Sequence, residues 1–90
     1  MAWFVYMLRC RDGSLYTGYT DDVERRLSVH QSGKGAKYTR SRLPVELAYQ
    51  EELPDKSAAL KREAAIKKLS RQQKMQLIGK NEETMKEKSL

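Results

Sequence analysis

The side chains of this 90-residue sequence that could carry chemistry are tyrosines, arginines, carboxylates and a single histidine, His30. The sequence contains no Walker phosphate loop, no Gly-x-Gly-x-x-Gly motif and no cluster of cysteine and histidine. With a single histidine, a metal site with several histidine ligands is excluded. The remaining residue types can build a phosphodiesterase. Such a site needs cations at the scissile phosphate, a group that deprotonates water and a carboxylate that holds one divalent metal.

Positive charge is the second feature that restricts the function. The 18 lysines and arginines outnumber the 12 acidic residues, which gives a formal net charge of +6 and an isoelectric point near 9.6. Such a chain attracts phosphate-rich partners at long range and through counterion release. Residues 24–42 contain six basic residues and one acidic residue, whereas residues 46–55 contain four acidic residues and no basic one. One face of the protein is therefore expected to be basic.

The length and composition predict one small globular domain without a second core. No apolar run approaches the roughly 20 residues of a membrane-spanning helix, so no membrane partner is expected. The first residues predict a strand rather than a signal peptide. Cys10 is the only cysteine and cannot form an internal disulfide, which agrees with a reducing compartment. These features predict a cytoplasmic protein.

Residues 3–10 and 14–20 predict the two strands of a β-hairpin, joined by a turn that contains an Asp-Gly pair. A two-residue turn would place Tyr6 and Tyr16 on opposite faces of the sheet. A three-residue loop with a left-handed glycine would pair Tyr6 with Gly18 and place both phenols on one face. The strand pattern alone does not choose between these two registers.

A helix is predicted over about 22–32, with Asp21 as its N-cap and Glu24 reaching back to form a capping box. Arg26 and His30 are four residues apart in this segment, and residues at this spacing are neighbours on a helix surface. Both lie beside the apolar stripe of the helix. They are therefore expected to share its inward or cleft side.

Residues 36–42 predict a short helix or a loop, and Pro44 begins a third strand that is expected to pair with the hairpin. A helix follows over about 57–69. Its apolar stripe is flanked by Glu63.

A second helical segment is predicted to restart at Ser70 and to end at Gly79. Residues 80–90 are polar and predict a disordered tail, so the expected domain spans residues 1–79. The element order β-β-α-(short α)-β-α-α predicts an α+β fold with a three-stranded antiparallel sheet flanked by helices.

The sequence resembles the GIY-YIG nuclease superfamily, and in particular its small, stand-alone, YhbQ-like branch. Five motifs in the same order carry this resemblance, which covers roughly residues 3–79: Phe4-Val5-Tyr6, Tyr16-Thr17-Gly18, the segment Thr20 to His30, the segment Lys34 to Leu47, and Arg62 to Leu69. A lone Tyr-x-Gly would be a weak signal. Five motifs in one order make a chance match improbable.

The resemblance implies roles for the residues of the hairpin and the first helix. Tyr16 would be the phenol nearest the attacking water, as its general base or positioner, and Tyr6 would assist through a hydrogen-bond relay. Two phenols in one site would favour the three-residue hairpin loop, which leaves room for a phosphate beside Gly18. Arg26 would clamp the scissile phosphate. His30 would contact a phosphate oxygen or protonate the leaving group.

The resemblance also implies that Glu63 is the sole protein ligand of a divalent metal, magnesium or manganese. Each of these residues has a purely structural explanation as well. Glu63 could form a salt bridge with Lys67, Arg26 could pair with Asp22, and His30 could be a satisfied core residue. The tyrosines could be half-buried sheet residues without a role in catalysis.

The implied function is metal-dependent endonucleolytic cleavage of DNA, directed by strand structure or damage, as in DNA repair, rather than by sequence. Residues of the basic region would position the nucleic-acid backbone: Lys34, Lys37, Tyr38, Arg40 and Arg42. The sequence leaves RNA open as the substrate. It is also compatible with a nucleic-acid-binding module that does not cleave, with a nuclease that needs a protein partner for activity or specificity, and with an interaction protein unrelated to nucleic acid.

Overall fold

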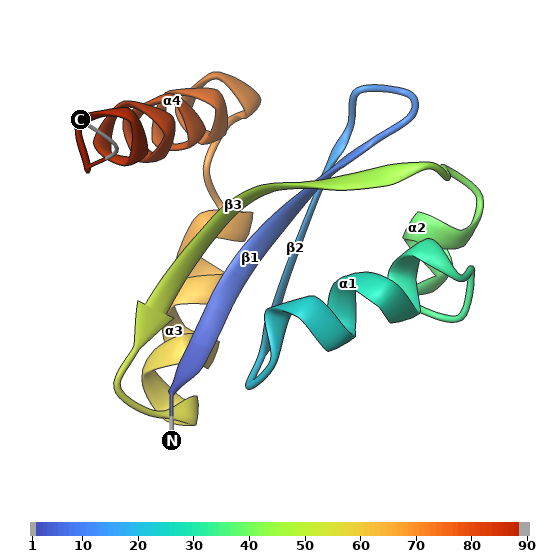
Figure 1. Ribbon diagram of the computed structural model, residues 1–90, viewed down its shortest axis with the longest axis horizontal. Coiled ribbons are helices and arrows are strands. Elements are labelled where there is room, and N and C mark those ends of the chain that lie inside the picture. Colours follow the sequence, from blue (N-terminus) through green and yellow to red (C-terminus); the bar gives the residue numbers. More distant parts are fainter. Residues whose placement is uncertain (1, 89–90) are drawn as a thin grey trace.

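A three-stranded antiparallel sheet forms the centre of the computed structural model, which describes residues 2–88 and the side chains of residues 2–80. The strands are β1 (Trp3–Cys10), β2 (Leu15–Thr20) and β3 (Val45–Leu53), and they lie in the order β2-β1-β3. The helices are α1 (Val23–Gln31), α2 (Lys37–Arg40), α3 (Lys56–Lys67) and α4 (Arg71–Lys88). The predicted α+β class and element order are confirmed (Figure 1).

The hairpin takes the register of the three-residue loop. Gly13 has a left-handed backbone with φ of +83°, as this loop requires. Tyr6 lies opposite Gly18, and Tyr16 lies opposite Leu8. Because side chains two residues apart on a strand share a face, Tyr6 and Tyr16 lie on the same face of the sheet.

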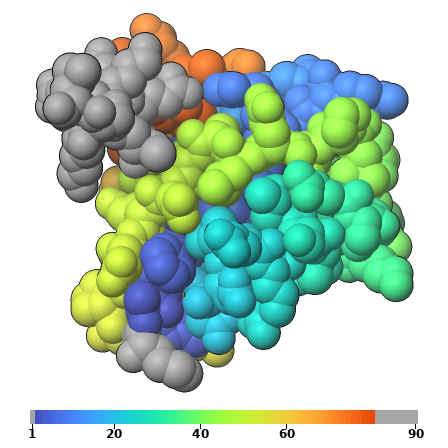
Figure 2. All heavy atoms as spheres, viewed as in Figure 1, coloured from blue at the N-terminus to red at the C-terminus, as the bar shows by residue number. Residues whose placement is uncertain are grey.

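The alternation of β1 side chains divides the core between the two faces of the sheet. One face packs against α3 through Val5, Met7 and Ile66. The other face packs against α1 through Leu8 and Leu27. The helices α1 and α3 therefore cover opposite faces (Figure 1), and in the space-filling view α1 and the segment after it form one side of the molecule next to β3 (Figure 2).

The N-cap of α1 is Asp22, so the predicted cap at Asp21 is wrong. The Asp22 carboxylate accepts a hydrogen bond of 3.1 Å from the Arg25 amide. Asp21 instead pairs with the Arg25 guanidinium at 3.0 Å. With Asp22 as the cap, Glu24 falls one position short of the place that a capping box requires, and the predicted box is absent.

The helix α4 continues through Gly79, so the predicted helix end at this residue is wrong. A glycine ends a helix by adopting a positive φ, and among the described residues only Gly13 and Gly33 do so. Residues 80–88 of the predicted disordered tail are thus helical, and residues 89–90 lie outside the described residues. The domain boundary after residue 79 stays a prediction. None of the described helices, α4 included, has the length and apolar character needed to cross a membrane.

Replacing Gly79 by alanine is expected to raise the free energy of unfolding by about 0.5–1 kcal/mol, because alanine loses less backbone entropy in a helix than glycine. A Cβ at this residue would meet no heavy atom within 4 Å. Urea unfolding of the wild type and of Gly79→Ala measures the difference. Unchanged or lower stability would contradict a helix that persists through residue 79 in solution.

Candidate active site

A pocket of about 380 Å³ lies along the free edge of β2, between α1 and α3. Its volume is at the lower end of the range for small-ligand sites. The pocket brings together five of the predicted site residues. The hairpin contributes Tyr6, Tyr16 and Gly18, α1 contributes Arg26, and α3 contributes Glu63. Arg26 and Glu63 thus approach one edge of the sheet from its two faces.

The absence of a side chain at Gly18 decides where the Tyr6 phenol lies. A Cβ at residue 18 would be 2.6 Å from the Tyr6 hydroxyl oxygen and 2.7 Å from the ring carbon that bears it. The phenol therefore crosses β2 at the one residue that leaves room for it. This brings the Tyr6 hydroxyl to the strand edge, with the Tyr16 ring centroid 6.5 Å from that of Tyr6.

His30 is fully buried behind Tyr6, and both of its ring nitrogens have partners. Nε2 lies 3.0 Å from the Tyr6 hydroxyl, and Nδ1 lies 2.8 Å from the Thr39 hydroxyl. Thr39 donates its only hydroxyl proton to the Ala36 carbonyl at 2.9 Å, so it must accept from His30 Nδ1–H. His30 Nε2 is then the unprotonated nitrogen, and the Tyr6 hydroxyl donates to it.

This arrangement changes the role expected for His30. A buried ring with two hydrogen-bonded nitrogens has no atom free to contact a phosphate, and His30 does not line the pocket. Its ring is 5.2 Å from the Tyr16 ring, between centroids, so it supports both phenols from behind. Gly35 permits this packing, because a Cβ there would collide with the imidazole.

The protonation states agree with this hydrogen-bond direction. Burial raises the pKa of Tyr6 above its ordinary value of 10.0, and a hydrogen bond with Arg26 offsets part of the rise. Burial also lowers the pKa of His30 below its ordinary value of 6.5, and the charge of Arg26 lowers it further. At neutral pH Tyr6 therefore keeps its proton and His30 is an uncharged acceptor.

The lowered pKa of His30 predicts a pH dependence of stability. Below about pH 6.5 the unfolded chain binds a proton at His30 that the folded protein does not, so stability falls as the pH falls toward the folded-state pKa. Between about pH 7.5 and about pH 5, the wild type is expected to lose more unfolding free energy than His30→Gln. Carboxylates titrate in both proteins. The difference between the two unfolding free energies, measured by urea unfolding at each pH, therefore isolates the contribution of His30. Parallel pH profiles of the two proteins would contradict the prediction.

Glu63 is the carboxylate placed to hold a metal. Its side chain is 16% exposed, and its salt bridge to Lys67 is long, at 3.7 Å. No group of three or more metal-ligating side chains occurs among the residues the structure describes. A single carboxylate in a pocket suits a magnesium ion, which keeps several water ligands and binds substrate phosphate oxygens. The donor set therefore fits the predicted ion.

No ion pair between Arg26 and Asp22 is found within the described residues.

The predicted backbone-contacting residues lie outside this pocket. Lys34, Lys37 and Arg40 are exposed on the segment around α2. Tyr38 is 39% exposed, and its ring stacks on that of Tyr16 at 6.1 Å between centroids. Tyr38 thus connects the basic segment to the pocket.

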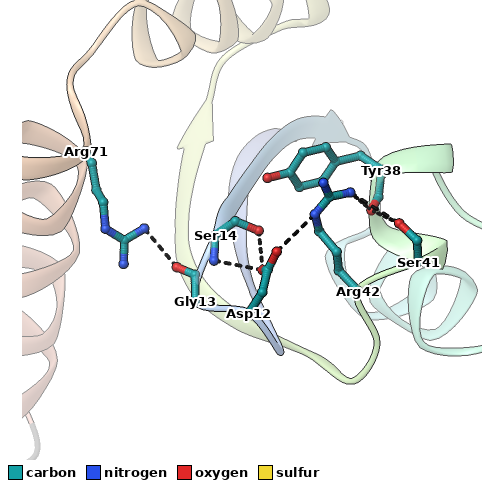
Figure 3. Close-up of polar contacts among 7 residues, drawn as sticks. All are labelled: Asp12, Gly13, Ser14, Tyr38, Ser41, Arg42 and Arg71. Atoms are coloured by element: carbon teal, nitrogen blue, oxygen red, sulfur yellow. Dashed lines mark hydrogen bonds and ion pairs between the residues drawn. The ribbon is translucent and has the colours of Figure 1, made fainter.

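Arg42 is occupied by contacts within the protein. Its guanidinium lies 3.8 Å from the centroid of the Tyr38 ring and pairs with Asp12 of the hairpin loop at 3.1 Å (Figure 3). It also donates to the Tyr38 carbonyl at 2.9 Å. Arg42 therefore fixes Tyr38 against the hairpin, a structural role that the sequence does not reveal.

Sequence reasoning missed Thr39, which orients His30, and five residues that line the pocket. These five are Trp3, Tyr19, Thr20, Asp21 and Lys56. Lys56 is seven residues before Glu63, a spacing that places two side chains on one helix face. The sequence could therefore have placed Lys56 on the same side of the helix as Glu63. Thr39 carries no such signal, because its segment could equally be a loop.

Comparison with known proteins adds a family relationship. The family model described as the GIY-YIG catalytic domain matches residues 2–76. A UPF0213 protein of Streptococcus sanguinis is 63% identical over 75 residues, which are 83% of this chain and 86% of that protein. A UPF0213 protein of Staphylococcus saprophyticus is 55% identical over 76 residues, 84% of this chain and 93% of that protein.

Two solution NMR structures are similar to this fold. The UPF0213 protein from Bacillus halodurans is 52% identical, with a TM-score of 0.57 and coverage of 88% of this chain and 84% of that chain. A protein from E. faecalis is 48% identical, with a TM-score of 0.61 and coverage of 89% and 85%.

Proposed function

The chain belongs to the GIY-YIG catalytic domain family, and from this premise we propose that it is a divalent-metal-dependent endonuclease that hydrolyses DNA phosphodiester bonds. One observation carries the proposal: two phenols, one guanidinium and one carboxylate line a single pocket, around the space left by Gly18. These groups can supply a base for water, a cation at the scissile phosphate and a ligand for a divalent metal. The net charge of +6 supports a polyanionic substrate.

The two phenols activate water in this proposal. Tyr6 donates its hydroxyl proton to His30 Nε2. As this proton moves to the imidazole, the Tyr6 oxygen can accept another proton. Tyr16 is the phenol nearest the attacking water: it positions the water or, as its base, takes a water proton while passing its own hydroxyl proton to the Tyr6 oxygen. His30 ends as an imidazolium whose Nδ1–H still donates to Thr39.

Arg26 and Glu63 act on the phosphate. The guanidinium of Arg26 binds the nonbridging oxygens as negative charge grows on them. Glu63 would hold magnesium or manganese, and the bound ion would supply Lewis-acid stabilisation of the phosphate and the leaving oxygen. The water oxygen bonds to phosphorus, the bond to the leaving oxygen breaks, and that oxygen takes a proton from solvent water.

Substrate choice is proposed to follow strand geometry or damage rather than base sequence. The pocket is small, and a protein of this size contacts a short stretch of DNA. Exposed cations near α2, Lys34, Lys37 and Arg40, would position the strand through its phosphates.

The test is cleavage of labelled duplex, single-stranded, flap, four-way-junction and RNA substrates, with magnesium, with manganese and with chelator. Metal-dependent cutting of at least one DNA is the expected result, and the panel ranks the geometries. Salt-sensitive binding of all substrates without cutting under either metal would overturn the proposal. It would favour a binding module that does not cleave.

A further inference from the structure

We propose that the Trp3 end of the pocket is a subsite for the nucleotide next to the scissile phosphate, whose base stacks on Trp3 and Tyr19 and whose phosphate binds Lys56. The inference rests on the proposed function and adds a substrate class to it. A base that stacks on a side chain has left the duplex stack, so the nucleotide must be unpaired.

The two aromatic rings form a fixed platform. Trp3 of β1 and Tyr19 of β2 have ring centroids 6.1 Å apart and planes tilted by 38°. Both rings pack on the core beneath α3 and are half-buried, so they are held in place while still lining the pocket. Every base has an aromatic face, and stacking on such a platform binds nucleotides without reading sequence.

Lys56 supplies the cation at this end of the pocket. Its ammonium lies 5.6 Å from the centroid of the Trp3 ring, and the side chain is exposed. Within the described part of the chain, Lys56 has no ion-pair partner: of the two acids that line the pocket, Asp21 pairs with Arg25 and Glu63 with Lys67. A lysine in the first turn of a helix is electrostatically unfavourable. A phosphate at Lys56 would relieve that repulsion.

The subsite adjoins the proposed reaction centre. Lys56 and Glu63 lie on one face of α3, seven residues apart, which is about 10.5 Å along a helix axis. Tyr19 and Gly18 are consecutive in β2. A strand that places one phosphate at Arg26 and Glu63 can therefore lay its neighbouring nucleotide over Trp3.

Trp3 is the only tryptophan in the chain, so intrinsic fluorescence reports on this subsite directly. The probes are a short single-stranded DNA, the same strand with abasic sites, and its duplex, all with chelator so that no cleavage occurs. We expect the single strand to quench Trp3 and the abasic strand and duplex to quench it much less. Equal quenching by all three would overturn the inference.

Variants measured by anisotropy of a labelled strand give a second readout. Trp3→Leu is expected to weaken single-strand binding by about fivefold or more, and Trp3→Phe to retain most of it. Lys56→Gln is expected to weaken binding more than Lys61→Gln, which removes the same charge from an exposed position of α3 outside the pocket. Equal losses for the two lysine variants would contradict a phosphate at Lys56. If Trp3→Leu fails to fold, the inference is tested by the quenching of Trp3 with intact and abasic strands and by the affinities of Lys56→Gln and Lys61→Gln.

The two proposals fail in different ways. Base-dependent quenching without cleavage under any metal would contradict the nuclease and leave the subsite intact. Cleavage together with equal quenching by intact and abasic strands would contradict the subsite alone.

Discussion

Glu63→Gln is expected to slow metal-dependent DNA cleavage by about 10²–10³-fold or more, because the amide keeps the shape of the side chain but loses the charge that holds the cation. Asp21, the other carboxylate that lines the pocket, is paired with Arg25 at 3.0 Å. DNA binding in chelator should be unchanged or slightly stronger, because a negative charge has left the pocket. Single-turnover cleavage over a magnesium titration measures the effect.

The matched control is Glu52→Gln, which removes the same charge from an exposed side chain of β3 outside the pocket. This variant should cleave at the wild-type rate. A wild-type rate for Glu63→Gln at low magnesium would show that Glu63 is no more than the partner of Lys67, with which it forms the 3.7 Å salt bridge.

Gly18→Ala is expected to lower the cleavage rate by about 10²-fold, because misplacing a catalytic group by about 1 Å has an effect of this size. The new Cβ would lie 2.6 Å from the Tyr6 hydroxyl oxygen, so the phenol must move and its hydrogen bond to His30 must lengthen or break. Cleavage under single-turnover conditions, with folding checked by circular dichroism, measures this loss.

Gly79→Ala is the control for this substitution, since it adds the same methyl group where no heavy atom lies within 4 Å. It should retain the wild-type cleavage rate. If Gly18→Ala cleaves as fast as Gly79→Ala, the Tyr6 position fixed by Gly18 is not required for catalysis.

The strands and five of the ten residues that line the pocket were predictable because they depend on short-range patterns. The strand pattern of β1 and the Asp-Gly turn allowed two registers of the β1–β2 hairpin. The requirement that Tyr6 and Tyr16 share one site favoured the register that the structure shows. The spacing of Arg26 and His30 placed both on the inner side of α1, and Glu63 was expected beside an apolar stripe.

The remaining features depend on tertiary contacts that no local pattern encodes. Burial makes His30 a partner of Tyr6 and Thr39. This matches the structural alternative of a satisfied core residue, whereas the resemblance implied contact with a phosphate oxygen or protonation of the leaving group. Arg42 was expected on DNA, but Asp12 of the distant hairpin loop pairs with it. Gly79 was expected to end a helix, but its backbone does not take the positive φ that a helix-ending glycine adopts.

The most direct test of the account is single-turnover cleavage of a labelled DNA by the wild type and by Tyr16→Phe, with magnesium and protein in excess over the DNA. Tyr16→Phe keeps the ring that packs between His30 and Tyr38 and removes only the hydroxyl. We expect metal-dependent cutting by the wild type and a rate about 10²-fold lower for Tyr16→Phe, with equal DNA affinity. Equal rates for the two proteins, or no cutting by the wild type with any DNA in the panel, would contradict it.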